Sequence, residues 1–218
     1  MTQINQHWNL ARSPAAGWPT DGDFAFNESP LPDPKEGQAL VKTIYLSLDP
    51  YQWGRRRSGV ETVGEVCHGR TVSQVIKTRH PTFREGDIIF NTNGWQKWGL
   101  VGQGISEFNY MHPRVIDPEL APISTAIGVL GMLGLTAYAG LYVQCQPKRG
   151  DTVVVSAASG GVGQNVVQFA RLKGCRVIGI AGSDDKCAYV KQVLGADDCI
   201  NRKAEHFEAL LAEACPEG

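Results

Sequence analysis

A glycine-rich turn between an apolar strand and an amphipathic helix carries the clearest chemistry in this sequence. Ala158-x-Gly160-x-x-Gly163 follows the β-branched run Val153–Val155 and opens a helical segment. The spacing matches the dinucleotide fingerprint, with alanine in place of the first glycine. Gly160 would let the backbone approach a pyrophosphate, Gly163 would let helix and strand pack closely, and the free N–H groups of the helix start would face the phosphates. We therefore predict that a dinucleotide binds the backbone of Gly160, Gly161, Val162 and Gly163.

The residues after the second strand predict which dinucleotide binds. NAD sites use an acidic side chain at this strand end to hold the ribose 2′-hydroxyl, whereas this strand ends in Gly182 and Ser183. Lys186 lies just beyond, and Arg202 follows the third strand at the same edge of the predicted sheet. Two cations at one edge can converge on a 2′-phosphate; the alternative is two solvated surface charges. We predict NADP, bound by Ser183, Lys186 and Arg202.

The segments around this turn predict a parallel sheet covered by helices. From Asp151 onward strand and helix patterns alternate three times, and the first helix places Val162, Val166 and Phe169 on one face. A doubly wound dinucleotide domain needs two such halves, and the sequence contains one. We therefore expect the chain to be a fragment of a longer protein, the alternative being a partner that supplies the remainder.

The first part of the chain has a different pattern. Short β-type runs at Ala39–Leu46, Thr71–Lys77 and Asp87–Phe90 are separated by proline and glycine clusters. Many short strands with frequent turn residues indicate a small barrel or sandwich. The expected domains are therefore a strand-rich domain at 1–122 and the first half of a dinucleotide-binding domain at 123–218.

Composition excludes several classes of protein. The net charge of −1 over 218 residues provides no basic field for nucleic acid. Six cysteines are scattered without a CxxC pair, which is typical of a reduced protein rather than a disulfide scaffold. The N-terminal residues lack the apolar run of a secretory signal. We expect a cytoplasmic protein.

One uncharged segment, Ala121–Val143, is long enough to cross a bilayer. Four glycines interrupt it, Pro122 and Ser124 are typical of a helix entrance, and a soluble strand–turn–helix unit follows directly. We therefore favour a buried helix–turn–helix that links two domains over a transmembrane helix, and expect no membrane association.

Taken together, the motifs resemble the zinc-independent branch of the medium-chain dehydrogenase/reductase superfamily, in particular the curcumin, prostaglandin and alkenal double-bond reductases. The matching segments are LSLDPY (Leu46–Tyr51), GRTVSQV (Gly69–Val75), FREGDIIF (Phe83–Phe90), GVLGMLGLTAY (Gly128–Tyr138), AASGGVG (Ala157–Gly163), LKGCRVIGIAGSDDKC (Leu172–Cys187) and LLAEACPEG (Leu210–Gly218). The resemblance implies an α/β protein with an N-terminal GroES-like β-barrel followed by a doubly wound Rossmann domain. Relatives continue past the ACPEG turn, so the resemblance also implies that the Rossmann domain is C-terminally incomplete.

The resemblance implies an oxidoreductase that transfers hydride from NADPH to the β-carbon of an α,β-unsaturated ketone or aldehyde. Hydroxyl donors would stabilise the enolate, which is then protonated at the α-carbon. Tyr51 is the expected donor, and Met132 and Thr136 are expected to line the nicotinamide pocket. The alternative for Tyr51 is a tyrosine packed at a barrel turn. The alternative for Met132 and Thr136 is simple helix packing.

Several positions depart from the family pattern. Gln52-Trp53 replaces the usual Met-Arg after Tyr51, and Leu133 replaces a proline. Relatives have two small residues where this chain has Gly69-Arg70, and a tyrosine or histidine where it has Arg202. The positions of zinc ligands in metal-dependent relatives hold Leu48 and Glu65-Val66-Cys67, so no metal site is expected.

Two classes of function remain open. The first is the NADPH-dependent enone reductase, whose expected partner is a small enone or alkenal and which we expect to be a homodimer. The second is an NADP(H)-binding sensor or interaction protein without turnover, or an inactive fragment of such a reductase. No nucleophile elbow or Ser-His-Asp pattern supports hydrolysis.

Overall fold

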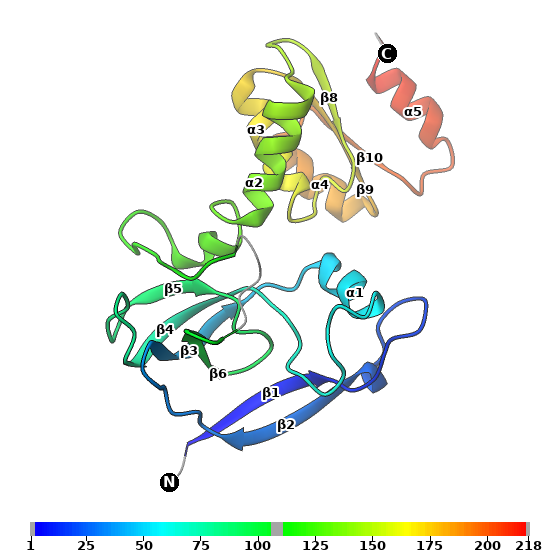
Figure 1. Ribbon diagram of the computed structural model, residues 1–218. Coiled ribbons are helices and arrows are strands. Elements are labelled where there is room, and N and C mark those ends of the chain that lie inside the picture. The colour runs from blue at the N-terminus through cyan, green and yellow to red at the C-terminus, as the bar shows by residue number, and fades with distance from the viewer. Residues whose placement is uncertain (1–2, 106–110, 217–218) are drawn as a thin grey trace. The chain divides into compact units, whose positions relative to one another are not determined.

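The computed structural model describes residues 3–105 and 111–216 (Figure 1). The last two residues of the predicted LLAEACPEG motif, Glu217 and Gly218, lie outside the described residues. Contacts divide the chain into an N-terminal unit, Met1–Ile127, and a C-terminal unit, Gly128–Gly218. Each unit has hydrophobic core clusters of its own.

Antiparallel strands dominate the N-terminal unit. A five-stranded sheet has the order β6-β3-β4-β5-β7, and its strands are β3 (Gln38–Leu46), β4 (Thr71–Thr78), β5 (Ile88–Asn91), β6 (Trp98–Gly102) and β7 (Arg114–Val115). A hairpin of β1 (Ile4–Leu10) and β2 (Phe24–Pro30) is joined to the rest of this unit by isolated bridges from His7 to Gln96 and from Asn9 to Val66. The strands predicted at 39–46, 71–77 and 87–90 are confirmed, with ends that shift by about one residue.

Short helices complete the N-terminal unit. They are the 3-10 turns Asp21–Asp23 and Ile123–Ile127 and the helix α1 (Pro50–Arg57). Pro50 occupies the first turn of α1. Backbone N–H groups in a first turn have no acceptor within the helix, so a proline there costs no hydrogen bond. Tyr51 therefore lies on a helix rather than at a barrel turn.

The C-terminal unit is a parallel α/β layer structure, as predicted. Its sheet has the order β10-β9-β8 with every pairing parallel, and its elements are α2 (Met132–Tyr138), the π-helix η3 (Ala139–Cys145), β8 (Thr152–Val155), α3 (Gly163–Lys173), β9 (Arg176–Ala181), α4 (Asp184–Gln192), β10 (Asp198–Asn201) and α5 (Phe207–Ala214). Gly174 ends α3 with φ +82°, the left-handed conformation expected of a glycine at this position.

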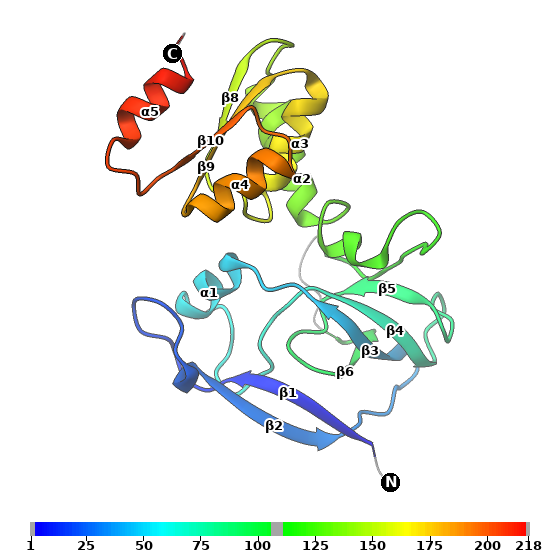
Figure 2. The ribbon, with the colours of Figure 1, turned by 180° about the vertical axis from the view of Figure 1, so that it is seen from behind.

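Helices cover both faces of this sheet (Figures 1 and 2). On one face, Val177 of β9 packs in a core with Val167 of α3 and Val190 of α4. On the other face, Ile178 packs with Ile200 and the residues of α5. Because neighbouring residues of β9 enter opposite cores, the strand is apolar without alternation, as parallel strands buried on both faces are. The edge of this sheet where β8, β9 and β10 end carries the predicted nucleotide-binding residues.

The uncharged segment at 121–143 is broken into separate short helices, as the helix–turn–helix interpretation requires. The expected burial is wrong for much of it, because Leu130, Leu135 and Val143 are exposed. Within the described ranges, no helix is long and apolar enough to cross a membrane.

Candidate functional site

The glycine turn has a tight backbone that side chains would disrupt. Ala157 adopts φ +48°, an uncommon left-handed conformation for a residue with a side chain. The N–H of Gly160 donates to the carbonyl oxygen of Ala157 over 2.8 Å, which closes the turn. A Cβ on Gly163 would overlap that same carbonyl oxygen and lie 2.9 Å from the Cα of Ala158. Gly163 is therefore required by the close approach of α3 to the turn.

The start of α3 offers free backbone donors. Among the described residues, none accepts a hydrogen bond from the N–H groups of Gly161 and Val162. Asn165 donates to the carbonyl oxygen of Gly161 over 2.7 Å, so the carbonyl side of this peptide is already paired. Unpaired N–H groups at a helix N-terminus, with the helix dipole behind them, favour an anion. These are the donors that the sequence predicts for a pyrophosphate.

A cavity of about 440 Å³ opens beside the turn. It is lined by Ala157, Ser159, Gly160, Ile180, Ala181, Gly182, Lys186 and Arg202. The structure thus brings the predicted pair Lys186 and Arg202 to one cavity with Gly160. Neither cation has an ion-pair partner in the part of the chain that is described, and both side chains are exposed.

The acidic residues beside the cavity are engaged elsewhere or act at the helix start. Asp184 accepts a hydrogen bond of 2.8 Å from the side chain of Asn201. Ser183 is the N-cap of α4, and its hydroxyl oxygen accepts from the N–H of Lys186 over 3.4 Å. Ser183 therefore positions the first turn of α4 and the Lys186 side chain that it carries.

Met132 and Thr136 lie on α2, apart from the lining of this cavity. The hydroxyl of Thr136 donates to the carbonyl oxygen of Met132 over 2.7 Å, so its proton is used within the helix. Leu133, which lies between them, is the residue of α2 that meets the glycine turn: its Cδ1 lies 2.9 Å from where a Cβ of Gly161 would be. The replacement of a proline by Leu133 is visible in the sequence, but this contact was not predicted.

Tyr51 belongs to a polar cluster in the N-terminal unit. Its hydroxyl lies 2.9 Å from Nε2 of His68, with a hydrogen bond between them. Burial raises the pKa of Tyr51, an effect that the positive charge of Arg70 opposes. Burial, and then the charges of Arg55, Arg56 and Arg70, lower the pKa of His68 to about 4. Both side chains are therefore neutral near pH 7.

Two neutral partners allow two hydrogen-bond arrangements. Tyr51 can donate to Nε2 of His68, or it can accept from an Nε2–H and direct its own proton outward. The second arrangement provides a hydroxyl donor for a substrate oxygen that gains negative charge. The contact of Tyr51 with His68 was not predicted, because His68 lies 17 residues from Tyr51 along the chain.

Comparison with known proteins matches each unit to a domain of oxidoreductases. Residues 6–106 match the N-terminal domain of oxidoreductase family, and residues 161–218 match the zinc-binding dehydrogenase family. The chain is 42% identical to NADPH-dependent curcumin reductase of Escherichia coli (strain K12) over 99% of this chain and 62% of that protein. It is 39% identical to prostaglandin reductase 1 of Bos taurus over 97% of this chain and 62% of that protein. The chain belongs to the medium-chain dehydrogenase/reductase superfamily.

Solved structures of superfamily members agree with this fold. CurA from Vibrio vulnificus in complex with NADPH superposes with a TM-score of 0.87, at 42% identity, over 98% of this chain and 62% of that one. Quinone oxidoreductase of Escherichia coli, complexed with NADPH, shares the fold with a TM-score of 0.72 at 18% identity. The predicted family, with its GroES-like and Rossmann-type units, is confirmed. The chain spans about 62% of the length of these relatives.

The described ranges of this superfamily member contain no cluster of candidate metal ligands. Within them, no group of three or more His, Cys, Asp or Glu side chains could hold a metal ion. Cys67 is buried, and burial raises its pKa to about 11, which disfavours the thiolate that metals bind.

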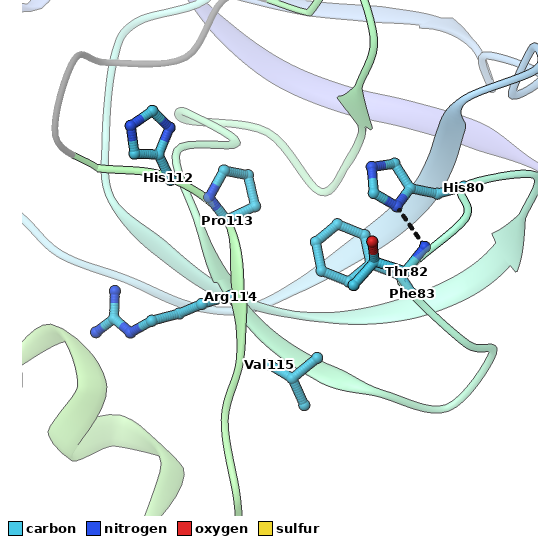
Figure 3. A pocket seen from close by; sticks show the side chains of 7 residues that line it. All are labelled: His80, Thr82, Phe83, His112, Pro113, Arg114 and Val115. Atoms are coloured by element: carbon cyan, nitrogen blue, oxygen red, sulfur yellow. Dashed lines mark hydrogen bonds between the residues drawn. The ribbon is translucent and has the colours of Figure 1, made fainter.

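A further cavity of about 480 Å³ lies on the N-terminal unit (Figure 3). It is lined by His80, Thr82, Phe83, His112, Pro113, Arg114 and Val115. His80 accepts a hydrogen bond of 3.1 Å from the N–H of Thr82 and stacks on Phe83 with ring centroids 4.4 Å apart. None of the predicted site residues lines it, and the rings of His80 and Phe83 pack on each other.

The environment of His68 predicts a loss of stability in acid. The pKa of His68 is about 4 in the folded chain against 6.5 for a free side chain, so the unfolded state binds more protons between these values. We expect the N-terminal unit to lose stability as pH falls from about 6.5 to 4. All five tryptophans lie in this unit, so urea unfolding followed by their fluorescence reports it.

His68→Gln should flatten this pH dependence, because a glutamine does not titrate. His206→Gln, which changes an exposed histidine of the C-terminal unit, is the matched control and should leave it unchanged. An equal loss of stability in His68→Gln and the unaltered chain would contradict the assignment to His68.

Proposed function

We propose that the protein is an NADPH-dependent reductase of the carbon–carbon double bond of α,β-unsaturated ketones or aldehydes. The observation that carries the proposal is the cavity in which Lys186 and Arg202 meet the glycine turn beside the neutral Gly182. This arrangement fits a 2′-phosphate, which distinguishes NADPH from NADH. Its relatives with named activities include curcumin, prostaglandin and alkenal reductases, which supports the substrate class.

The residues of this chain divide the proposed work between binding and charge stabilisation. The N–H groups of Gly161 and Val162 would hold the pyrophosphate, and Lys186 and Arg202 the 2′-phosphate. Bound NADPH would supply the hydride that the β-carbon accepts. Tyr51 would donate a hydrogen bond to the substrate oxygen as negative charge grows on it, and a proton added at the α-carbon would complete the reduction.

The division of the chain supports separate roles for its two parts. We propose 1–122 as the substrate and catalytic domain and 123–218 as the nucleotide-binding domain. The break in contacts between Ile127 and Gly128 supports a boundary close to this point. Met132 and Thr136 are proposed at the nicotinamide end of the nucleotide, and Ser183 beside its 2′-phosphate. A homodimer in the cytoplasm remains our proposal for the whole protein.

Loss of the absorbance of reduced nicotinamide tests the reaction. The protein, NADPH and a simple enone should consume NADPH, whereas the matching saturated ketone should not. Turnover with the enone alone supports the reductase. Tight NADPH binding without consumption would favour a nucleotide-binding protein without turnover, and absence of NADPH binding would contradict both.

Gly182→Asp should change the nucleotide preference. The missing Cβ of Gly182 lies 3.6 Å from Nε of Arg202, so a carboxylate there would pair with Arg202 and repel a 2′-phosphate. We expect NADPH to bind at least about 10-fold more weakly, with NADH unchanged or tighter. Titration of nucleotide fluorescence measures both, and Gly182→Asn separates charge from size. Equal changes for the two nucleotides would contradict this role of Gly182.

A further inference from the structure

The Arg70 side chain is a buried charge in the N-terminal unit. It has no exposed surface. Its Nη2 pairs with Oδ2 of Asp49 at 2.6 Å and donates to the hydroxyl of Ser47 over 3.2 Å. Nε and Nη1 are also buried, and neither has a hydrogen-bond partner in the described part of the chain. Buried donors without acceptors cost stability, so packing alone does not account for an arginine here.

Arg70 is fixed beside the helix that carries Tyr51. Asp49 is the residue immediately before α1, and Ser47 accepts at its carbonyl oxygen a hydrogen bond of 2.8 Å from the side chain of Gln52. The guanidinium carbon of Arg70 lies 5.8 Å from the centre of the Tyr51 ring. The arginine therefore ties the start of α1 to β4, with its charge against the phenol.

His68, which meets the hydroxyl of Tyr51, is itself fixed. The backbone N–H of His68 donates to Oε2 of Glu61 over 3.0 Å. Arg56 donates to the backbone carbonyl oxygen of His68 over 3.1 Å. Arg56 also pairs with Glu61 at 3.2 Å. Tyr51 therefore has a fixed, neutral imidazole at its hydroxyl and a fixed cation near its ring.

We propose that Arg70 is a positioning residue for Tyr51: its guanidinium, held by Asp49 and Ser47, fixes the phenol against His68 and strengthens it as a hydrogen-bond donor to a substrate oxygen. The donor role rests on the proposed function, whereas the coupling of Arg70 to Tyr51 does not. A phenol that donates to an enolate gains partial negative charge on its own oxygen, which a fixed positive charge stabilises.

The charges around Tyr51 set the direction of the expected change. Burial raises the pKa of Tyr51; the charge of Arg70 lowers it, and the charge of Asp49 raises it by less. His68 is neutral near pH 7 and adds no charge. Removal of Arg70 and Asp49 together should therefore raise the pKa of Tyr51 further, without leaving either charge buried and unpaired.

The test is the titration of Tyr51 in the double variant Arg70→Gln/Asp49→Asn. Tyrosine labelled with ¹³C at Cζ is observed by NMR, and Tyr51→Phe assigns its signal. We expect a higher pKa for Tyr51 in the double variant. Arg12→Gln/Asp23→Asn, which removes another ion pair of the same unit, should leave the signal unchanged.

Arg70→Lys is the second variant and decides the question if the double variant does not fold. A lysine keeps the charge near Asp49 but lacks the planar fork, so the Tyr51 and His68 signals should both shift. Unchanged Tyr51 and His68 signals in the folded variants would overturn the proposal.

Turnover separates this inference from the proposed function. In a chain that reduces an enone, the double variant should lower kcat about 10-fold with KM within about 3-fold, because the interaction strengthens in the transition state. A shifted Tyr51 signal without any turnover supports the coupling and counts against the reductase. Turnover with an unaltered kcat in the double variant would overturn the role of Arg70.

Discussion

Gly163→Ala is expected to abolish NADPH binding and to destabilise the C-terminal unit by about 1–3 kcal/mol, the usual cost of forcing extra atoms into a packed site. The added Cβ would overlap the carbonyl oxygen of Ala157 and meet the Cα of Ala158 at 2.9 Å. Both contacts are backbone atoms, which cannot rotate away as a side chain would. Ala157 is already left-handed and Ala158 is fully buried, so relief of the clash would move the turn itself.

The matched control is Gly140→Ala in η3 of the same unit. A Cβ there meets no atom within 4 Å, so we expect normal NADPH binding and unchanged or slightly raised stability. Thermal unfolding by circular dichroism and nucleotide fluorescence measure the two effects. Normal NADPH binding by a folded Gly163→Ala protein would remove the fingerprint interpretation of the turn.

The geometry of the glycine turn was predictable because its determinants are local. Gly160, Gly163 and the flanking strand and helix are close in sequence, and Gly174 directly follows the last residue of α3. Lys186 and Arg202 needed one further step: the ends of parallel strands share one edge of the sheet. Their convergence on one cavity follows from the order β10-β9-β8.

The Tyr51 cluster was only partly predictable. Tyr51 followed from a resemblance, but its partners His68 and Arg70 come from a loop and from the residue before β4. No periodicity links these positions, and the helix α1 itself has too few apolar residues to show a helical pattern. The contact of Leu133 with the glycine turn likewise depends on how α2 packs on α3, which sequence spacing does not define.

The double variant Lys186→Ala/Arg202→Ala is expected to weaken NADPH binding about 100-fold or more and NADH binding by less than about 3-fold. Each charge-assisted hydrogen bond to a phosphate contributes about 1.5–3 kcal/mol, and about 1.4 kcal/mol corresponds to a factor of ten. NADH lacks the 2′-phosphate, so it loses none of these bonds. Lys186→Ala alone should weaken NADPH binding about 10-fold, again with little change in NADH binding. Nucleotide fluorescence titrations with the two reduced nucleotides give both affinities.

Loss of positive charge at this edge of the sheet could weaken NADPH binding without loss of a direct contact. Lys203→Ala separates that general effect from the contacts of Lys186 and Arg202. Lys203 is an exposed cation beside Arg202 that does not line the cavity. Added salt screens long-range attraction, so it should erase any effect of Lys203→Ala on NADPH binding. The larger loss of NADPH over NADH binding in the double variant should mostly persist in added salt. If the double variant weakened NADH as much as NADPH, Lys186 and Arg202 would be general phosphate contacts. The preference for NADPH would then have to come from other residues.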